Sequence, residues 1–317
     1  MFELVPASAV ALAHVASAAP GAVSAAATAA GASTTTAWWV WPVLLFVTTF
    51  IIGVLAVLGG VGGGVLFTPI VGGFFPFGMD FVRSAGLIVA LSGALAAGPG
   101  LLKRNLASLR LAIPVALIAS TCSIFGAMVG LKAPDSITKT CLGITILLIA
   151  LLFLVSKSSE FPKIPGADAL AKALQINGIY HEASTGKVVE WTVFRTPLGL
   201  FLFIFIGFMA GMFGLGAGWA NVPVLNLLMG APLKISVATS KFLLSITDTS
   251  AAWVYLNSGA CLPLIVVPSV IGIMLGSLVG VRVLAVTKPK AVRWIVIIML
   301  FVAGLKPLYD GIKLLSK

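Results

Sequence analysis

The stretch GGVGGG at residues 59–64 lies at the centre of 42 consecutive uncharged residues, Trp38–Met79. As one continuous helix, a segment of this length would extend about 60 Å, twice the roughly 30 Å thickness of the hydrocarbon core of a bilayer. Each glycine inside a helix costs about 1 kcal/mol relative to alanine, so the stretch is a poor helix interior. The sequence therefore predicts a hairpin: one helix, a glycine break and a shorter helix that returns. It leaves open whether the hairpin crosses the bilayer or turns inside it.

The whole chain has the composition of a membrane protein. Hydrophobic residues make up 60% of its 317 positions and charged residues only 9%, whereas soluble proteins carry roughly 25% charged residues. Too few polar side chains remain to cover a surface that faces water, so the bilayer is the expected solvent. Stretches such as Leu142–Val155 are apolar on every side, which favours helices over the alternating strands of a barrel. We therefore expect an all-α, polytopic, multi-pass protein of the inner (cytoplasmic) membrane.

The glycine-rich hairpin occurs twice. Thr196–Leu233 is again uncharged, with glycines at its centre. At an offset of 154 residues, five glycines and prolines of the first half (Gly60, Gly62, Gly64, Pro69 and Pro114) fall on Gly214, Gly216, Gly218, Pro223 and Pro268. Three segments follow each hairpin and are expected to be transmembrane helices: Ser84–Leu102, Leu111–Leu131 and Thr140–Ser156, which are uncharged, then Ile235–Leu256, Ala260–Val281 and Ala291–Leu305. Internal repeats of this kind are typical of transporters.

These patterns divide the chain into four regions: an Ala-rich N-terminal tail (1–37), a first transmembrane repeat (38–157), a cytoplasmic insert (158–195) and a second transmembrane repeat (196–317). The tail contains no Lys or Arg, so a disordered tail is favoured over a cleaved signal peptide, which remains an alternative. Within the insert, Ile176–Glu182 and Lys187–Phe194 predict two short strands around a turn at residues 184–186. We interpret this insert as a connector.

The number of crossings in each half predicts that the second half is inverted. A hairpin contributes two crossings or none, and three helices then make the total odd. Thirteen of the twenty Lys and Arg residues lie in segments 103–110, 157–195 and 282–293 and at Lys234. Basic loops face the cytoplasm, which agrees with two inverted-topology repeats and places both termini outside, although basic residues near the C-terminus oppose that placement of this end. The hairpins would then enter from opposite faces and meet near the midplane.

The glycine breaks are the first candidate site. Broken helices expose backbone N–H groups and the positive ends of helix dipoles, which favour a small anion. The candidate substrate-binding glycines are Gly62, Gly63 and Gly64 in the first hairpin and Gly214, Gly216 and Gly218 in the second. The alternative is that these glycines only allow close helix packing. Asn221 follows Gly218 by three residues, and its counterpart is Phe67. Its amide is suited either to binding an anion or to packing.

The segment after the second hairpin adds polar candidates. Ser240 and Lys241 are candidates for substrate binding, and Lys241, about 9 Å from the end of its helix, has the alternative of extending to the interface. Asp248 lies about 20 Å in, where a charge costs roughly 2.5–3.5 kcal/mol. We expect it to couple transport to protons, with a hydrogen-bonded buried acid as the alternative. Weaker candidates are Ser92, Trp253 and Tyr255.

Several function classes lack the residues they need. Three cysteines without a CxxC pair and two distant histidines provide no disulfide framework and no metal site, and we expect no cofactor. The net charge of +11 is attributed to cytoplasmic loops rather than to nucleic-acid binding. An intramembrane enzyme would have to use a pair such as Ser240 and Lys241, so we do not expect an enzyme. The chain has no Walker A motif, so ATP would have to be supplied by another chain.

The paired motifs resemble those of the TauE/SafE family of sulfite exporters. The residues that carry the resemblance are GVGGG (60–64) with Pro69, and GMFGLGAG (211–218) with Pro223 and the following ATS (238–240). The resemblance extends from Pro42 to the C-terminus. It implies a secondary transporter in the lipid bilayer that exports a small inorganic or organosulfonate anion, sulfite or a product of taurine breakdown. A passive anion channel or an uptake permease is the alternative. Transport direction, coupling ion and a homo-oligomeric state are left open.

Overall fold

The structure is a computed structural model that describes residues 39–59, 62–102, 107–155, 162, 165–181, 188–284 and 289–315. The expectations for the N-terminal tail, for Gly60 and for the turn at 184–186 lie outside the described residues. Helices account for most of the described chain, as the sequence predicts. Among the residues that the structure describes, two segments are β-strands, and both lie in the insert.

The described residues of the first half form five helices: α2 (Val40–Gly59), α3 (Gly63–Phe74), α4 (Met79–Leu102), α5 (Leu109–Lys132) and α6 (Asp135–Val155). The helices α2 and α3 form the expected hairpin of one long and one short helix. At the start of this hairpin, the Trp41 ring lies 6.1 Å from the ring of Phe75 and 5.8 Å from that of Phe77, centroid to centroid. Because Phe75 directly follows α3, the hairpin returns to the end at which it starts.

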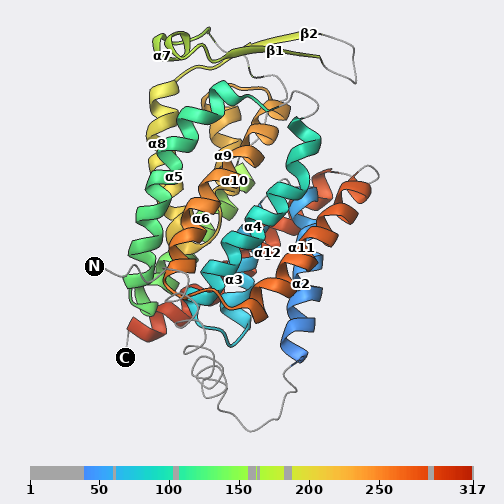
Figure 1. Ribbon diagram of the computed structural model, residues 1–317, viewed down its shortest axis with the longest axis vertical. Helices are drawn as coiled ribbons and strands as arrows, with labels where there is room; N and C mark the ends of the chain where they lie inside the picture. The colour runs from blue at the N-terminus through green and yellow to red at the C-terminus, as the bar shows by residue number, and fades with distance from the viewer. Residues whose placement is uncertain are drawn as a thin grey trace, which may run out of the picture.

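The insert contains α7 (Ala169–Ala173), β1 (Asn177–His181) and β2 (Val188–Thr192). The two strands pair antiparallel, with Asn177 opposite Thr192, and they lie within the two segments for which the sequence predicts short strands. These elements lie across one end of the helical bundle, which we call the insert end (Figure 1). The other end is called the opposite end.

The second half contains α8 (Thr196–Phe213), α9 (Gly218–Pro223), the π-helix η1 (Val224–Leu228), α10 (Leu233–Asn257), α11 (Pro263–Leu284) and α12 (Pro289–Leu315). The second hairpin consists of α8 and the two short helices α9 and η1. Its ends are joined by a hydrogen bond in which the Phe194 N–H donates to the Met229 carbonyl at 2.9 Å. This hairpin therefore opens at the insert end, whereas the α2–α3 hairpin opens at the opposite end (Figure 1).

Several helix boundaries differ from the sequence prediction. The helix α4 begins at Met79 instead of Ser84, because Asp80 occupies the first helical turn, where a negative charge is favourable. Arg83 is thereby placed inside the helix rather than before it. Similarly, α6 begins five residues before Thr140, and α12 continues ten residues past Leu305. Charged residues mark the ends of the apolar segments in the sequence, but the helices extend beyond the apolar core of a span.

Within the described residues, five helices contain segments that are long and apolar enough to cross a membrane: Val40–Val57, Met79–Ala96, Leu109–Lys132, Thr196–Phe213 and Pro263–Gly280. Gly63–Phe74 and Ser136–Leu152 are shorter apolar helices. Large apolar side chains are exposed on the outside of the bundle, for example Leu117 and Phe201, each 66% exposed. Such a surface is suited to lipid rather than water.

Glycines bring pairs of helices into backbone contact. In α2, a side chain at Gly53 would collide with the Ile273 carbonyl of α11. In α8, a side chain at Gly207 would collide with the Ala119 carbonyl of α5. Small residues at such contacts allow close helix packing in membranes. The two pairs α2·α11 and α5·α8 are therefore held by the same kind of interface.

Asp168 links the insert to the second hairpin, and its loss is expected to loosen the insert. Its carboxylate accepts hydrogen bonds from the Ala171 N–H at 2.8 Å, the Thr196 hydroxyl at 2.9 Å and the Thr196 N–H at 2.7 Å. Replacing Asp168 by Ala removes the caps of α7 and α8, at a cost of about 1–2 kcal/mol. We expect faster proteolysis within the insert of D168A. The exposed Glu190 provides a control, E190Q, and equal cleavage rates for the two variants would contradict this linkage.

Candidate functional site

The tips of the two hairpins, residues 62–64 and 214–218, lie against each other. A methyl group on Gly218 would be 3.1 Å from both Cα and N of Gly62, and 3.2 Å from Cδ1 of Leu244 in α10. These distances are shorter than ordinary van der Waals contacts. The tips thus meet backbone to backbone, at the positions where the sequence predicts a meeting of the two glycine breaks.

Two glycines with left-handed backbone form the turn of the second hairpin. Gly214 has φ +66° and Gly216 has φ +68°, a region that residues with a Cβ rarely adopt. A Cβ on Gly216 would lie 2.9 Å from Oδ2 of Asp248 and 3.0 Å from the Ala90 Cβ. Gly214 packs against the backbone of Arg83 in α4. The turn is therefore held between Arg83 on one side and Asp248 on the other.

Close packing is a sufficient reason for glycine at two other positions. A Cβ on Gly63 would be 2.9 Å from Cδ1 of Ile273, and one on Gly64 would be 2.6 Å from the Leu215 carbonyl. The neighbouring Thr68 hydroxyl donates a 2.8 Å hydrogen bond to the Gly214 carbonyl and so ties the first hairpin to the second. The packing alternative thus applies to Gly63 and Gly64 whether or not they also contact an anion.

The short helix α9 carries buried polar atoms without protein partners. Asn221 is 1% exposed, and neither its amide oxygen nor its amide nitrogen has a hydrogen-bond partner among the residues that the structure describes. The same is true of the indole N–H of Trp219. Buried polar groups without partners cost about 1–3 kcal/mol each. They are therefore expected to be satisfied by water or by a ligand.

Asp248 is the buried acid of α10. Its side chain is fully buried, and within the described part of the chain neither carboxylate oxygen meets hydrogen-bond geometry with a partner. The hydroxyl of the adjacent Thr247 is likewise buried and without a partner in that part of the chain. An acid in such a place is suited to protonation events.

Ser240 and Lys241 lie two turns before Asp248 on α10. Ser240 is buried, and Lys241 is partly buried. The side chains of Lys241 and Asp248 do not form an ion pair within 4.0 Å. The structure thus brings the tip glycines and Asp248 together directly, and places Lys241 on the same helix without a direct contact to Asp248.

The family of the chain follows from comparison with known proteins. The model of the family described as "Sulfite exporter TauE/SafE" matches residues 45–306. The chain belongs to this family. The match begins within α2 and ends within α12, so it includes both glycine-rich tips and the helices between them.

Two curated relatives of this TauE/SafE member are named as transporters. The "Probable membrane transporter protein YunE" of Bacillus subtilis (strain 168) is 29% identical over 119 residues, which cover 38% of this chain and 44% of YunE. The "Probable membrane transporter protein MJ0441" of Methanocaldococcus jannaschii is 24% identical over 278 residues, 83% of this chain and 93% of that protein. No solved structure matches the chain.

Arg83 and Trp219 are not among the candidate residues that the sequence predicts. Arg83 was placed outside the helix that follows the first hairpin, yet it is buried. A signal was present, since Arg83 follows Asp80 by three residues, a spacing at which opposite charges pair on one helix. Among the weaker candidates, Ser92 donates to the Ile88 carbonyl of its own helix, Trp253 is 65% exposed, and Tyr255 is buried. Trp253 therefore faces outward instead of lining an internal site.

Proposed function

We propose that this TauE/SafE member is a secondary transporter that exports a small sulfur-containing anion, sulfite or an organosulfonate, across the cytoplasmic membrane. Its substrate site would lie at the two hairpin tips near the bilayer midplane. The insert end, which carries most of the basic loops, would face the cytoplasm. The proposed substrate-binding set is the tip glycines with Asn221, Ser240 and Lys241, and Asp248 is the proposed coupling residue.

The proposed architecture is a pair of inverted-topology repeats, and the helix contacts support it. The contact between Gly53 and Ile273 has a counterpart in the repeat-related pair Gly207 and Ala119, which lie 154 residues after Gly53 and 154 residues before Ile273. In both pairs a glycine packs against a backbone carbonyl. A second pair obeys the same rule. Gly280 packs on the Val54 carbonyl, and its counterpart Gly126 packs on the Phe208 carbonyl. Together with hairpins that open at opposite ends, these matched contacts favour an approximate twofold axis in the membrane plane.

One observation is the main support for placing the substrate site at the hairpin tips. Where the two broken hairpins touch, at Gly62 and Gly218, the second hairpin also holds the Asn221 amide without a protein partner in the described chain. The Gly62 N-cap of α3 has no side chain to cap the first N–H groups of that helix. Backbone and amide N–H groups at a helix start bind anions well. The sulfur chemistry of the substrate is supported by the family description rather than by the names of the two relatives.

The test is counterflow of labelled sulfite in proteoliposomes that contain the full chain. A carrier accelerates uptake when unlabelled sulfite is present inside, whereas a channel does not, so this assay separates the proposal from the passive alternative. We expect N221A to lower the counterflow rate at least about tenfold, the equivalent of about 1.4 kcal/mol. The control is N257A, since Asn257 is exposed and its amide bonds the Trp253 carbonyl within α10. Equal rates for N221A and N257A would remove Asn221 from the site.

A further inference from the structure

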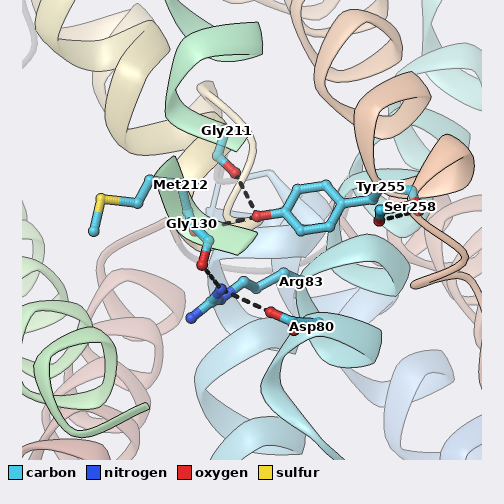
Figure 2. Close-up of polar contacts among 7 residues, drawn as sticks. All are labelled: Asp80, Arg83, Gly130, Gly211, Met212, Tyr255 and Ser258. Carbon is cyan, nitrogen blue, oxygen red and sulfur yellow. Dashed lines mark hydrogen bonds and ion pairs between the residues drawn. The ribbon is translucent and has the colours of Figure 1, made fainter. Parts of the chain in front are cut away.

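Arg83 is the largest fully buried side chain among the described residues, at 1% exposure. One terminal nitrogen, Nη1, makes two contacts: it donates to the Gly130 carbonyl of α5 at 2.6 Å and to Oδ1 of Asp80 at 2.9 Å. The Asp80 side chain is 47% exposed, so the pair joins a buried cation to an acid near the surface. Figure 2 shows both contacts on the same nitrogen, while the other terminal nitrogen points away from Asp80 and Tyr255.

The other edge of the guanidinium makes no hydrogen bond to the residues that the structure describes. Nε and Nη2 of Arg83 are buried and have no hydrogen-bond partner among the residues that the structure describes. These two nitrogens carry three N–H groups, and they form the side of the guanidinium that binds two oxygens of one group in parallel. A buried cation whose N–H groups remain unsatisfied is costly, more so than a neutral group. The edge is therefore suited to an anion rather than to an apolar environment.

Arg83 lies next to the second hairpin tip. Its backbone packs against Gly214, at one end of the turn whose other end, Gly216, packs against Asp248. The Tyr255 hydroxyl donates to the Gly211 carbonyl at 3.0 Å, immediately before this turn (Figure 2). A shift of the tip would therefore be transmitted directly to Arg83.

A pocket of about 300 Å³ adjoins this cluster at the opposite end of the bundle. It is lined by Asp80, Leu131 and Ser258, among others. Asp80 is thus shared between the pocket wall and the Arg83 contact. Arg83 is placed between this pocket and the hairpin tips, on the side away from the insert.

We infer that the free Nε–Nη2 edge of Arg83 is a second anion site that selects oxyanions, binding two oxygens of a sulfite, sulfonate or carboxylate group. A spherical anion such as chloride gains little from two parallel N–H groups, so this edge would discriminate by shape as well as charge. The inference rests on the proposed function only for the class of anion. Because Arg83 lies between the tips and the opposite end, the site is a binding position on the path that the anion takes.

The test is thermal unfolding of the purified full chain in detergent, with sodium sulfite, sodium methanesulfonate or sodium chloride at equal ionic strength. For the wild type we expect a saturable rise in unfolding temperature with the two oxyanions that exceeds the effect of chloride. R83K retains the charge but not the bidentate edge, and its half-saturating oxyanion concentration should be at least tenfold higher. D80N removes a carboxylate that competes for the guanidinium, and its half-saturating concentration should be several-fold lower. The control N257A, at an exposed residue whose amide bonds the Trp253 carbonyl within α10, should stay within twofold of the wild type.

Several outcomes would overturn the inference: no oxyanion-specific rise in the wild type, an R83K value within twofold of the wild type, or weaker binding by D80N. If R83K does not fold, the half-saturating oxyanion concentration of D80N tests the inference. Asp80 is half exposed, and its loss leaves the Gly130 contact of Arg83 intact. Sulfite counterflow separates this inference from the proposed function. If oxyanion binding depends on Arg83 but no counterflow occurs, only the transport proposal is refuted. If counterflow occurs and R83K binds oxyanions as the wild type does, only the Arg83 site is refuted.

Discussion

The variant G216A is expected to lose transport almost completely while the protein still reaches the membrane. Alanine at φ +68° costs about 1–2 kcal/mol, because a Cβ in left-handed backbone crowds the following carbonyl. The new methyl group would also lie 2.9 Å from Oδ2 of Asp248 and 3.0 Å from the Ala90 Cβ. The turn or α10 must therefore move. Misplacing reacting groups by about 1 Å can lower enzyme rates about 100-fold, and we expect a loss of similar size in sulfite counterflow.

The control for G216A is G93A. Gly93 lies in α4, and a methyl group there would meet only the Ile273 Cγ1, at an ordinary 3.9 Å. G93A is expected to keep the counterflow rate of the wild type, since alanine is also the better helix former. Comparable amounts of both variants in the membrane would show that the loss in G216A arises at the tip. Normal counterflow by G216A would mean that the turn does not need its left-handed glycine.

The hairpins were predictable because glycine clusters and charge-free lengths are properties of the sequence itself. The GGVGGG stretch and the matched glycines at an offset of 154 indicate where helices break. In the structure, α2 ends at Gly59 and α3 begins at Gly63, while α8 ends at Phe213 and α9 begins at Gly218. The meeting of Gly62 with Gly218 also agrees with the prediction. These features follow from backbone chemistry, which does not depend on which way each helix faces.

The burial of individual side chains was harder to predict, because these helices are apolar on nearly all sides. An amphipathic pattern would show which face is inside, but in lipid both faces are apolar. Trp253 and Tyr255 are two residues apart, yet the first is 65% exposed and the second fully buried. Arg83 was missed because a charge close to a helix end was interpreted as the end. Its burial depends on Gly130 and Asp80, and its partner on α5 is distant in sequence.

The second large effect is expected for D248N, which should abolish the response of transport to a pH gradient. The carboxylate of Asp248 is fully buried, and no hydrogen bond to it is found among the described residues. An unpaired charge inside a protein costs several kcal/mol, so an acid there is suited to bind or release a proton when water reaches it. Asparagine keeps the shape and removes the proton-binding oxygen. We therefore expect wild-type sulfite flux to change with an imposed pH gradient at zero membrane potential, and D248N flux not to change.

Counterflow at equal pH on both sides tells whether D248N has lost only the coupling or the whole site. If Asp248 couples protons, D248N retains exchange of labelled for unlabelled sulfite, because exchange requires no net proton movement, while it loses at least about tenfold in gradient-driven accumulation. The control is D310N, since Asp310 is a partly exposed acid near the end of α12. If D248N flux still followed the pH gradient as the wild type and D310N do, the coupling role of Asp248 would be refuted. Asp248 would then be a structural acid that packs against the Gly216 turn.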